Sequence, residues 1–136
     1  MNKLEKMRNY ADLPIRLAVG FHLIYGTQDN VFSWNRMLEF RDFLEIFGAP
    51  LPLASAIISV YAQFFAGILF ILGWKVREAG AVMIFNFIVA ILLVHLNDPY
   101  PNIYPAISML AGAIFLVLNG TGHVSLQHWL ESKKGN

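Results

Sequence analysis

The sequence has 136 residues, of which 57% are hydrophobic and 14% charged, and its formal net charge is +1. That length favours a single domain, the apolar fraction exceeds the roughly 45–50% typical of soluble domains, and the near-zero net charge gives no reason to expect nucleic acid as a partner. The chain contains no cysteine, which excludes disulfides, dithiol relays, thiolate nucleophiles and cysteine-ligated zinc or iron–sulfur centres.

The charged residues are confined to short segments of the chain. Residues 46–74, 79–97 and 99–130 contain no Asp, Glu, Lys or Arg. Uncharged runs of about 18 residues or more are typical of membrane-spanning helices, whereas a soluble helix carries charged residues on its outer face at about every turn. The sequence therefore predicts one integral membrane domain over residues 1–136.

The first span is predicted at about residues 13–30, which is long enough for a helix to cross a bilayer at about 1.5 Å per residue. His22, Tyr25 and Asp29 follow i, i+3, i+7 spacing and share one face of that helix. Arg16 points roughly the opposite way. We interpret Arg16 as a snorkelling side chain or a lipid-headgroup contact near the cytoplasmic face.

An amphipathic helix is predicted at about residues 34–47, between the first and second spans. Apolar residues recur there at helical spacing from Met37 to Phe47, and charged residues occupy much of the remaining surface. Ser33 is suited to cap its N-terminus and Gly48 to end it. We expect this helix to lie along the membrane surface or to cap the bundle.

Three further spans are predicted at about residues 52–74, 79–97 and 103–120. The second span carries Ser55, Ser59 and Gln63 at intervals of four residues, which forms a narrow polar stripe on a bulky helix. The third span carries Asn86 and, on another face, His95. The predicted fold is all-α: a four-helix transmembrane bundle with an extra interfacial helix.

The distribution of basic residues predicts the orientation of the bundle. With four spans, only Arg36 and Arg41 lie on one side of the membrane. The residues that lie on the other side are Lys3, Lys6, Arg8, Lys75, Arg77, Lys133 and Lys134. Because cytoplasmic loops carry an excess of Lys and Arg, both termini are expected in the cytoplasm.

A polar layer is predicted at mid-depth in the bundle. Helix rise places His22 and Gln63 about halfway through the bilayer and Asn86 nearer the cytoplasmic side. A histidine inside a membrane suggests a function, and its two nitrogens suit a quinone carbonyl or a proton relay. Together with Tyr25 these residues form a hypothetical binding site, although Asn, Gln and Ser in such bundles often only tie helices together. No catalytic residue is identified.

A second polar layer, composed of Gln28, Asp29 and His95, is predicted toward the outside. Asp29 would accept a hydrogen bond from His95 if their helices are neighbours. Bis-histidine haem is disfavoured, because its two ligands must lie at one depth and His22 and His95 differ by roughly 10 Å. No HExxH motif or cluster of His and Asp is present, so no metal site is expected. No cofactor is evident, and quinone remains open.

Several short motifs follow one another over residues 13–120. They are Arg16-Leu17 with Gly20, Tyr25-Gly26-Thr27-Gln28-Asp29, Pro50-Leu51-Pro52, Ala62-Gln63-Phe64 with Gly67, Leu72-Gly73 and Val94-His95-Leu96. In this order and spacing the sequence resembles the DoxX family of small four-span membrane proteins of the bacterial inner membrane. The family's namesake is the small subunit of a thiosulfate:quinone oxidoreductase. Many relatives place an acidic residue in the second span, where this sequence has Gln63.

The resemblance implies an accessory, quinone-interacting subunit of a membrane redox system, which is not expected to be catalytic alone. Two alternatives remain open, namely a conduit for protons or small solutes and a structural partner in a larger complex. The partners that these readings imply are the lipid bilayer, redox proteins and a second copy of the chain.

Overall fold

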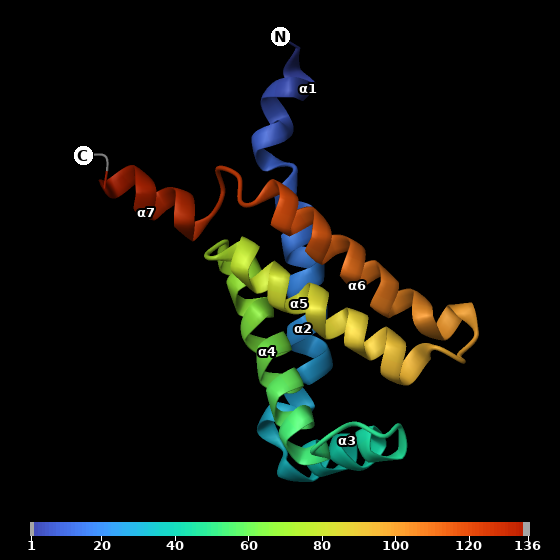
Figure 1. The fold of residues 1–136 in the computed structure, drawn as a ribbon. Helices are drawn as coiled ribbons and strands as arrows, with labels where there is room; N and C mark the ends of the chain where they lie inside the picture. The colour runs from blue at the N-terminus through green and yellow to red at the C-terminus, as the bar shows by residue number, and fades with distance from the viewer. Residues whose placement is uncertain (1, 135–136) are drawn as a thin grey trace.

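The computed structural model describes residues 2–134, and every regular element in that range is helical (Figure 1). In chain order the elements are α1 (Lys3–Lys6), the 3₁₀ turn η1 (Met7–Tyr10), α2 (Asp12–Phe32), α3 (Trp34–Ile46), α4 (Pro52–Leu72), α5 (Val76–Ala90), the π-helical turn η2 (Ile91–His95), α6 (Tyr100–Asn119) and α7 (Leu126–Lys134). The all-helical prediction is confirmed.

Three helices are long and apolar enough to cross a membrane: Pro52–Leu72, Val76–His95 and Tyr100–Asn119. They correspond to the predicted second, third and fourth spans. Helix α2 is as long as α4, at 21 residues each. It carries Asp12, Arg16 and Asp29 and is not among these three helices.

Helices α2 and α4 pack side by side along their length (Figure 1). They approach most closely at Gly20 and Gly67, where a Cβ atom added to either glycine would lie 2.8 Å from the carbonyl oxygen of the other. Small residues at such a crossing let two membrane helices bring their backbones together. The absence of a side chain at both positions therefore sets the distance between α2 and α4.

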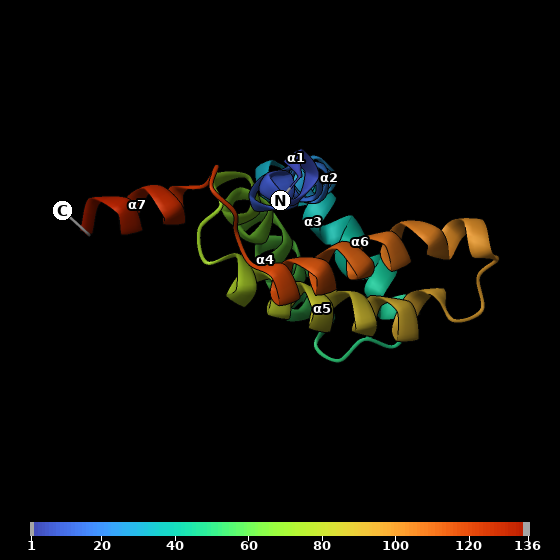
Figure 2. The same ribbon diagram turned by 90° about the horizontal axis from the view of Figure 1, so that it is seen from above.

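Helices α5 and α6 form a second antiparallel pair, which diverges from the α2–α4 pair toward the turn between α5 and α6 (Figures 1 and 2). The two pairs meet in one hydrophobic core. Its fully buried members include Leu23 of α2, Phe70 of α4, Met83 of α5 and Leu116 of α6. Because the pairs share this core but then separate, space remains between them at the other end.

Helix α3 lies across the end of α4 (Figure 1). The side chain of Ser33 accepts a hydrogen bond from the backbone N–H of Arg36, as expected of an N-cap. Met37 and Leu44 are buried and pack in one cluster with Ala56 and Val60 of α4. The predicted helix at residues 34–47 therefore forms, and its apolar face packs against a neighbouring helix.

The N-terminal segment, the turn between α4 and α5 and the C-terminal segment meet at one end of the bundle (Figure 1). The backbone N–H of His123 donates to the carbonyl of Asn9 at 2.9 Å, and that of Gln127 donates to the carbonyl of Gly73 at 3.0 Å. These bonds gather the three segments that contain most of the lysines and arginines.

Arg16 is buried at this end, with 1% of its surface exposed. Its Nη1 atom lies 3.2 Å from Oδ2 of Asp12, and its Nη2 atom donates to the carbonyl of Val124 at 2.7 Å. The same Asp12 oxygen accepts a hydrogen bond from the backbone N–H of Gly122 at 3.0 Å. The interpretation of Arg16 as a snorkelling or headgroup-binding residue is wrong, because residues 122–124 fold over the start of α2 and exclude lipid and water from its guanidinium.

Candidate functional site

A cavity of about 510 Å³ lies between the diverging helix pairs. Residues of α2, α3, α4, α5, η2 and α6 line it, and it is partly open rather than enclosed. Six of its 23 lining residues are polar: His22, Ser55, Ser59, Gln63, Asn86 and His95. Its volume lies within the range of about 300–1,000 Å³ that is usual for small-molecule sites, which are likewise mostly apolar with a few polar groups.

Three of the polar side chains form a hydrogen-bonded line from α4 to α5. Gln63 Nε2 donates to Ser59 Oγ at 3.0 Å, and Ser59 Oγ donates to Asn86 Oδ1 at 2.8 Å. All three residues are half-buried. Gln63 and Asn86, both predicted for the mid-depth layer, are thus brought together through Ser59, which belongs to the polar stripe of the second span.

This line leaves the amide NH2 group of one residue and the amide oxygen of the other without a partner. Within residues 2–134 neither the Nδ2 atom of Asn86 nor the Oε1 atom of Gln63 has a hydrogen-bond partner. Exchanging the nitrogen and oxygen of both amides reverses the direction of the line through Ser59, but it still leaves one amide NH2 group and one amide oxygen unused. The two residues, which line the cavity from adjacent helices, therefore supply both a free donor group and a free acceptor.

His22 also lines the cavity, but its side chain is exposed and belongs to the rim. In the described part of the chain, no hydrogen bond joins it to Gln63 or Asn86. Tyr25, the fourth predicted binding residue, is 65% exposed and stacks on Phe21, with the ring centroids 5.8 Å apart. The cavity thus contains His22, Gln63 and Asn86, while Tyr25 lies outside its lining.

The predicted outer layer is not gathered into one group. Gln28 and Asp29 lie near the end of α2 and do not line the cavity, whereas His95 does. The His95 ring is held by Asp98, whose Oδ2 atom lies 3.0 Å from Nδ1, rather than by Asp29. Asp98 follows His95 by three residues, so this pair forms within one turn of chain.

His95 is the last residue of the π-helical turn η2. Wider turns of this kind inside α-helices occur often at functional sites. Leu93, Val94 and His95 of this turn all line the cavity. The irregular part of the third predicted span therefore lines the cavity.

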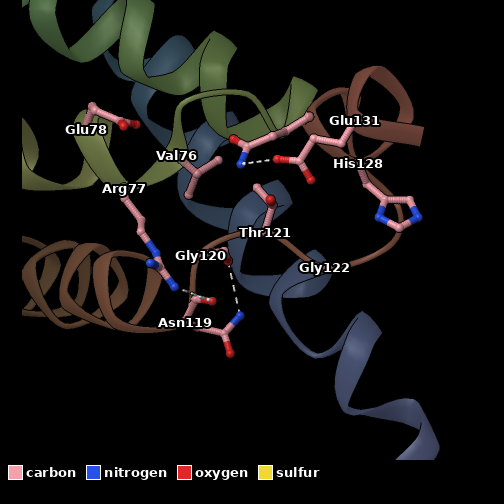
Figure 3. A pocket seen from close by; sticks show the side chains of 10 residues that line it. Val76, Arg77, Glu78, Asn119, Gly120, Thr121, Gly122, His128 and Glu131 are labelled. Carbon is pink, nitrogen blue, oxygen red and sulfur yellow. Dashed lines mark hydrogen bonds between the residues drawn. The ribbon is translucent and has the colours of Figure 1, made fainter. Parts of the chain in front are cut away.

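A second, polar pocket of about 260 Å³ lies at the end where the three basic segments meet (Figure 3). Figure 3 shows Arg77 directed toward Asn119, whose carbonyl accepts a hydrogen bond from Nη2 at 3.4 Å. Charges of both signs line this pocket, and Glu131 accepts a hydrogen bond from Gln127 at 3.4 Å. The first contact joins the start of α5 to the end of α6, and the second lies within α7. Both are structural contacts, so the larger cavity is the candidate site.

Comparison with known proteins gives one match. The DoxX family model matches residues 11–96, which is more than half of the chain and extends from the start of α2 to just beyond η2. No curated protein and no solved structure matches the chain. The matched range contains His22, Ser59, Gln63, Asn86 and His95.

Proposed function

The chain belongs to the DoxX family, and from this premise we propose that it is a four-span protein of the bacterial inner membrane that binds a quinone or quinol in its central cavity. In this proposal it serves as an accessory subunit of a membrane redox system. A partner protein delivers or receives the electrons, because dithiol exchange is excluded in a chain without cysteine.

The packing of α2 supports its assignment as the fourth membrane span. It lies along α4, a helix that is long and apolar enough to cross a membrane, and has the same number of residues. Two of its charged residues, Asp12 and Arg16, are paired and buried against the rest of the protein. Asp12 and Arg16 therefore do not place charge against lipid.

The distribution of charge supports cytoplasmic termini. The segments that meet beside Arg16 contain Lys75, Arg77 and the basic residues near both ends of the chain, whereas only Arg36 and Arg41 lie at the other end. The positive-inside rule then directs the first group to the cytoplasm. Helix α3 would lie at the outer surface, where its charged face meets water.

The observation that carries the functional proposal is the free amide pair in a mainly apolar cavity. A free N–H of Asn86 or Gln63 suits a quinone carbonyl, and a free amide carbonyl suits a quinol hydroxyl. Because the cavity is not enclosed, a lipophilic molecule would be able to enter it from the bilayer. Seventeen of the 23 lining residues are apolar, which favours such a ligand over a water-filled conduit.

We expect Asn86→Leu to lower the affinity for a short-chain benzoquinone about tenfold. The substitution removes one amide from the cavity, and the loss of a hydrogen bond at a desolvated site costs about 1–2 kcal/mol. The measurement is a binding titration with the purified chain in lipid nanodiscs. Asn102→Leu is the matched control, because Asn102 is exposed and does not line the cavity.

Equal affinity for the quinone in wild type and Asn86→Leu, with Asn102→Leu also unchanged, would show that the amides of Gln63 and Asn86 do not bind the quinone. In the same titration, His22→Ala tests whether the side chain of His22, at the edge of the cavity, contributes to quinone binding. We expect a weaker effect of about two- to threefold, because His22 is exposed and outside the hydrogen-bonded line.

A further inference from the structure

The outer end of the cavity contains a histidine whose tautomer is fixed by its neighbour. His95 Nδ1 lies 3.0 Å from Asp98 Oδ2. An ionised carboxylate can only accept hydrogen bonds, so the proton of the neutral ring must reside on Nδ1. The other ring nitrogen, Nε2, is then an acceptor, and within residues 2–134 it has no hydrogen-bond partner.

From this geometry we propose that His95 forms a second binding station, at which Nε2 accepts a hydrogen bond from the hydroxyl group of a lipophilic quinol or phenol. The inference rests on the proposed function, because it concerns the same cavity. It adds a selectivity that the amide pair does not have. The amide pair offers both a donor and an acceptor, whereas neutral His95 offers only an acceptor and therefore favours the reduced, hydroxyl-bearing form.

The two stations are too far apart to hold one ring at the same time. His95 follows Asn86 by nine residues in the same span, which corresponds to about 13 Å along a helix. Apolar residues such as Leu93, Val94 and Met109 line the cavity together with both groups. A headgroup would therefore occupy either the amide station or the His95 station, with its tail against the apolar walls.

A purely structural role for the pair is the alternative. A histidine near a helix C-terminus that bonds to a nearby carboxylate also stabilises the turn that follows. The side chains of His95 and Asp98 are 27% and 35% exposed, respectively. A structural role would affect all ligands of the cavity equally, whereas an acceptor at Nε2 distinguishes a hydroxyl from an ether. The test therefore compares these two groups on one ring.

The probes are a short-chain benzoquinol, kept reduced under anaerobic conditions, and its dimethyl ether, which has the same ring but no O–H donor. Both are titrated into the full chain in nanodiscs. We expect wild type to bind the quinol about fivefold more tightly than the ether. His95→Phe should still bind both molecules but lower this preference to about twofold, the part that the amide carbonyl supplies, and Gln63→Leu should retain most of it.

Asp98 is a positioning residue in this scheme, and two variants test it. Asp98→Asn can donate an N–H to Nδ1 as well as accept from it, and Asp98→Ala can do neither. Both variants therefore free the tautomer of His95 and should reduce the preference for the quinol to about twofold. A preference that survives His95→Phe in full and disappears in Gln63→Leu would overturn the His95 station but leave the proposed function standing. Failure of wild type to bind either molecule would contradict the proposed function itself.

Discussion

Replacing Gly67 by Leu will separate α2 from α4 and destabilise the bundle by about 3 kcal/mol or more. A Cβ atom at this position would lie 2.8 Å from the backbone oxygen of Gly20, and backbone cannot move aside as the end of a flexible side chain can. Overpacking of a tight interface typically costs about 1–3 kcal/mol, and here the substituent extends beyond Cβ. The measurement is reversible unfolding of the purified chain in mixed detergent micelles.

Gly26→Leu is the matched control for this result. Gly26 lies in α2, the helix that contains Gly20, but no atom lies within 4 Å of the position that its Cβ would occupy. The same change in residue size should therefore leave the free energy of unfolding nearly unchanged. Similar stabilities for Gly67→Leu and Gly26→Leu would show that α2 and α4 do not cross at these glycines.

Replacing Arg16 by Met will lower the free energy of unfolding by about 3–5 kcal/mol, which is the usual loss when one member of a buried ion pair is removed. Asp12, only 1% exposed, would keep its bond from the Gly122 N–H but lose its cation. The carbonyl of Val124 would lose its donor as well. Residues 122–124 should then detach from the start of α2, which proteolysis at these residues would detect.

Two further variants distinguish a buried pair from a general effect of charge. The double variant Asp12→Leu, Arg16→Met should recover much of the lost stability, because apolar residues of similar volume often replace buried pairs without net cost. Arg36→Met is the exposed control, since Arg36 and Glu39 pair at 3.1 Å with most of their surface exposed. We expect it to change stability by less than about 0.5 kcal/mol. An Arg16→Met effect as small as that of Arg36→Met would contradict the buried pair.

The sequence predicted the helices well because their signals are local. Uncharged runs fixed the positions of α4, α5 and α6, and the spacing of Met37 and Leu44 predicted α3 together with the side of α3 that is buried. Helix rise also placed Gln63 and Asn86 at similar depths. The hydrogen bonds through Ser59 depend on how α4 and α5 are rotated about their axes, and no pattern along the chain reports that rotation.

Two polar pairs were not predicted from the sequence, Asp12 with Arg16 and His95 with Asp98. Asp12 precedes Arg16 by four residues, a spacing that allows a pair on one helix face. Burial of the pair depends on residues 122–124, more than 100 positions away, for which the sequence gives no signal. His95 was assigned to Asp29 on another helix, although Asp98 lies three residues further along the same chain.

Both pairs lie near the end of a predicted span. In the folded chain Asp12 becomes buried, and Asp98 contacts the ring of His95, which lines the cavity. For Asp12 the missing information is tertiary. The family likeness, which rests on motifs within residues 11–96, does not supply it.

Photolabelling tests the central claim most directly, namely that a quinone occupies the cavity between the two helix pairs. The chain in nanodiscs would be illuminated with a photoreactive short-chain quinone, and the labelled residues would be identified by peptide mass spectrometry. We predict labels on cavity-lining residues such as Ser59, Val89 and Leu93, reduced by an excess of unlabelled quinone. Labels confined to outward-facing residues such as Phe21 and Leu118, and unaffected by the competitor, would contradict the account.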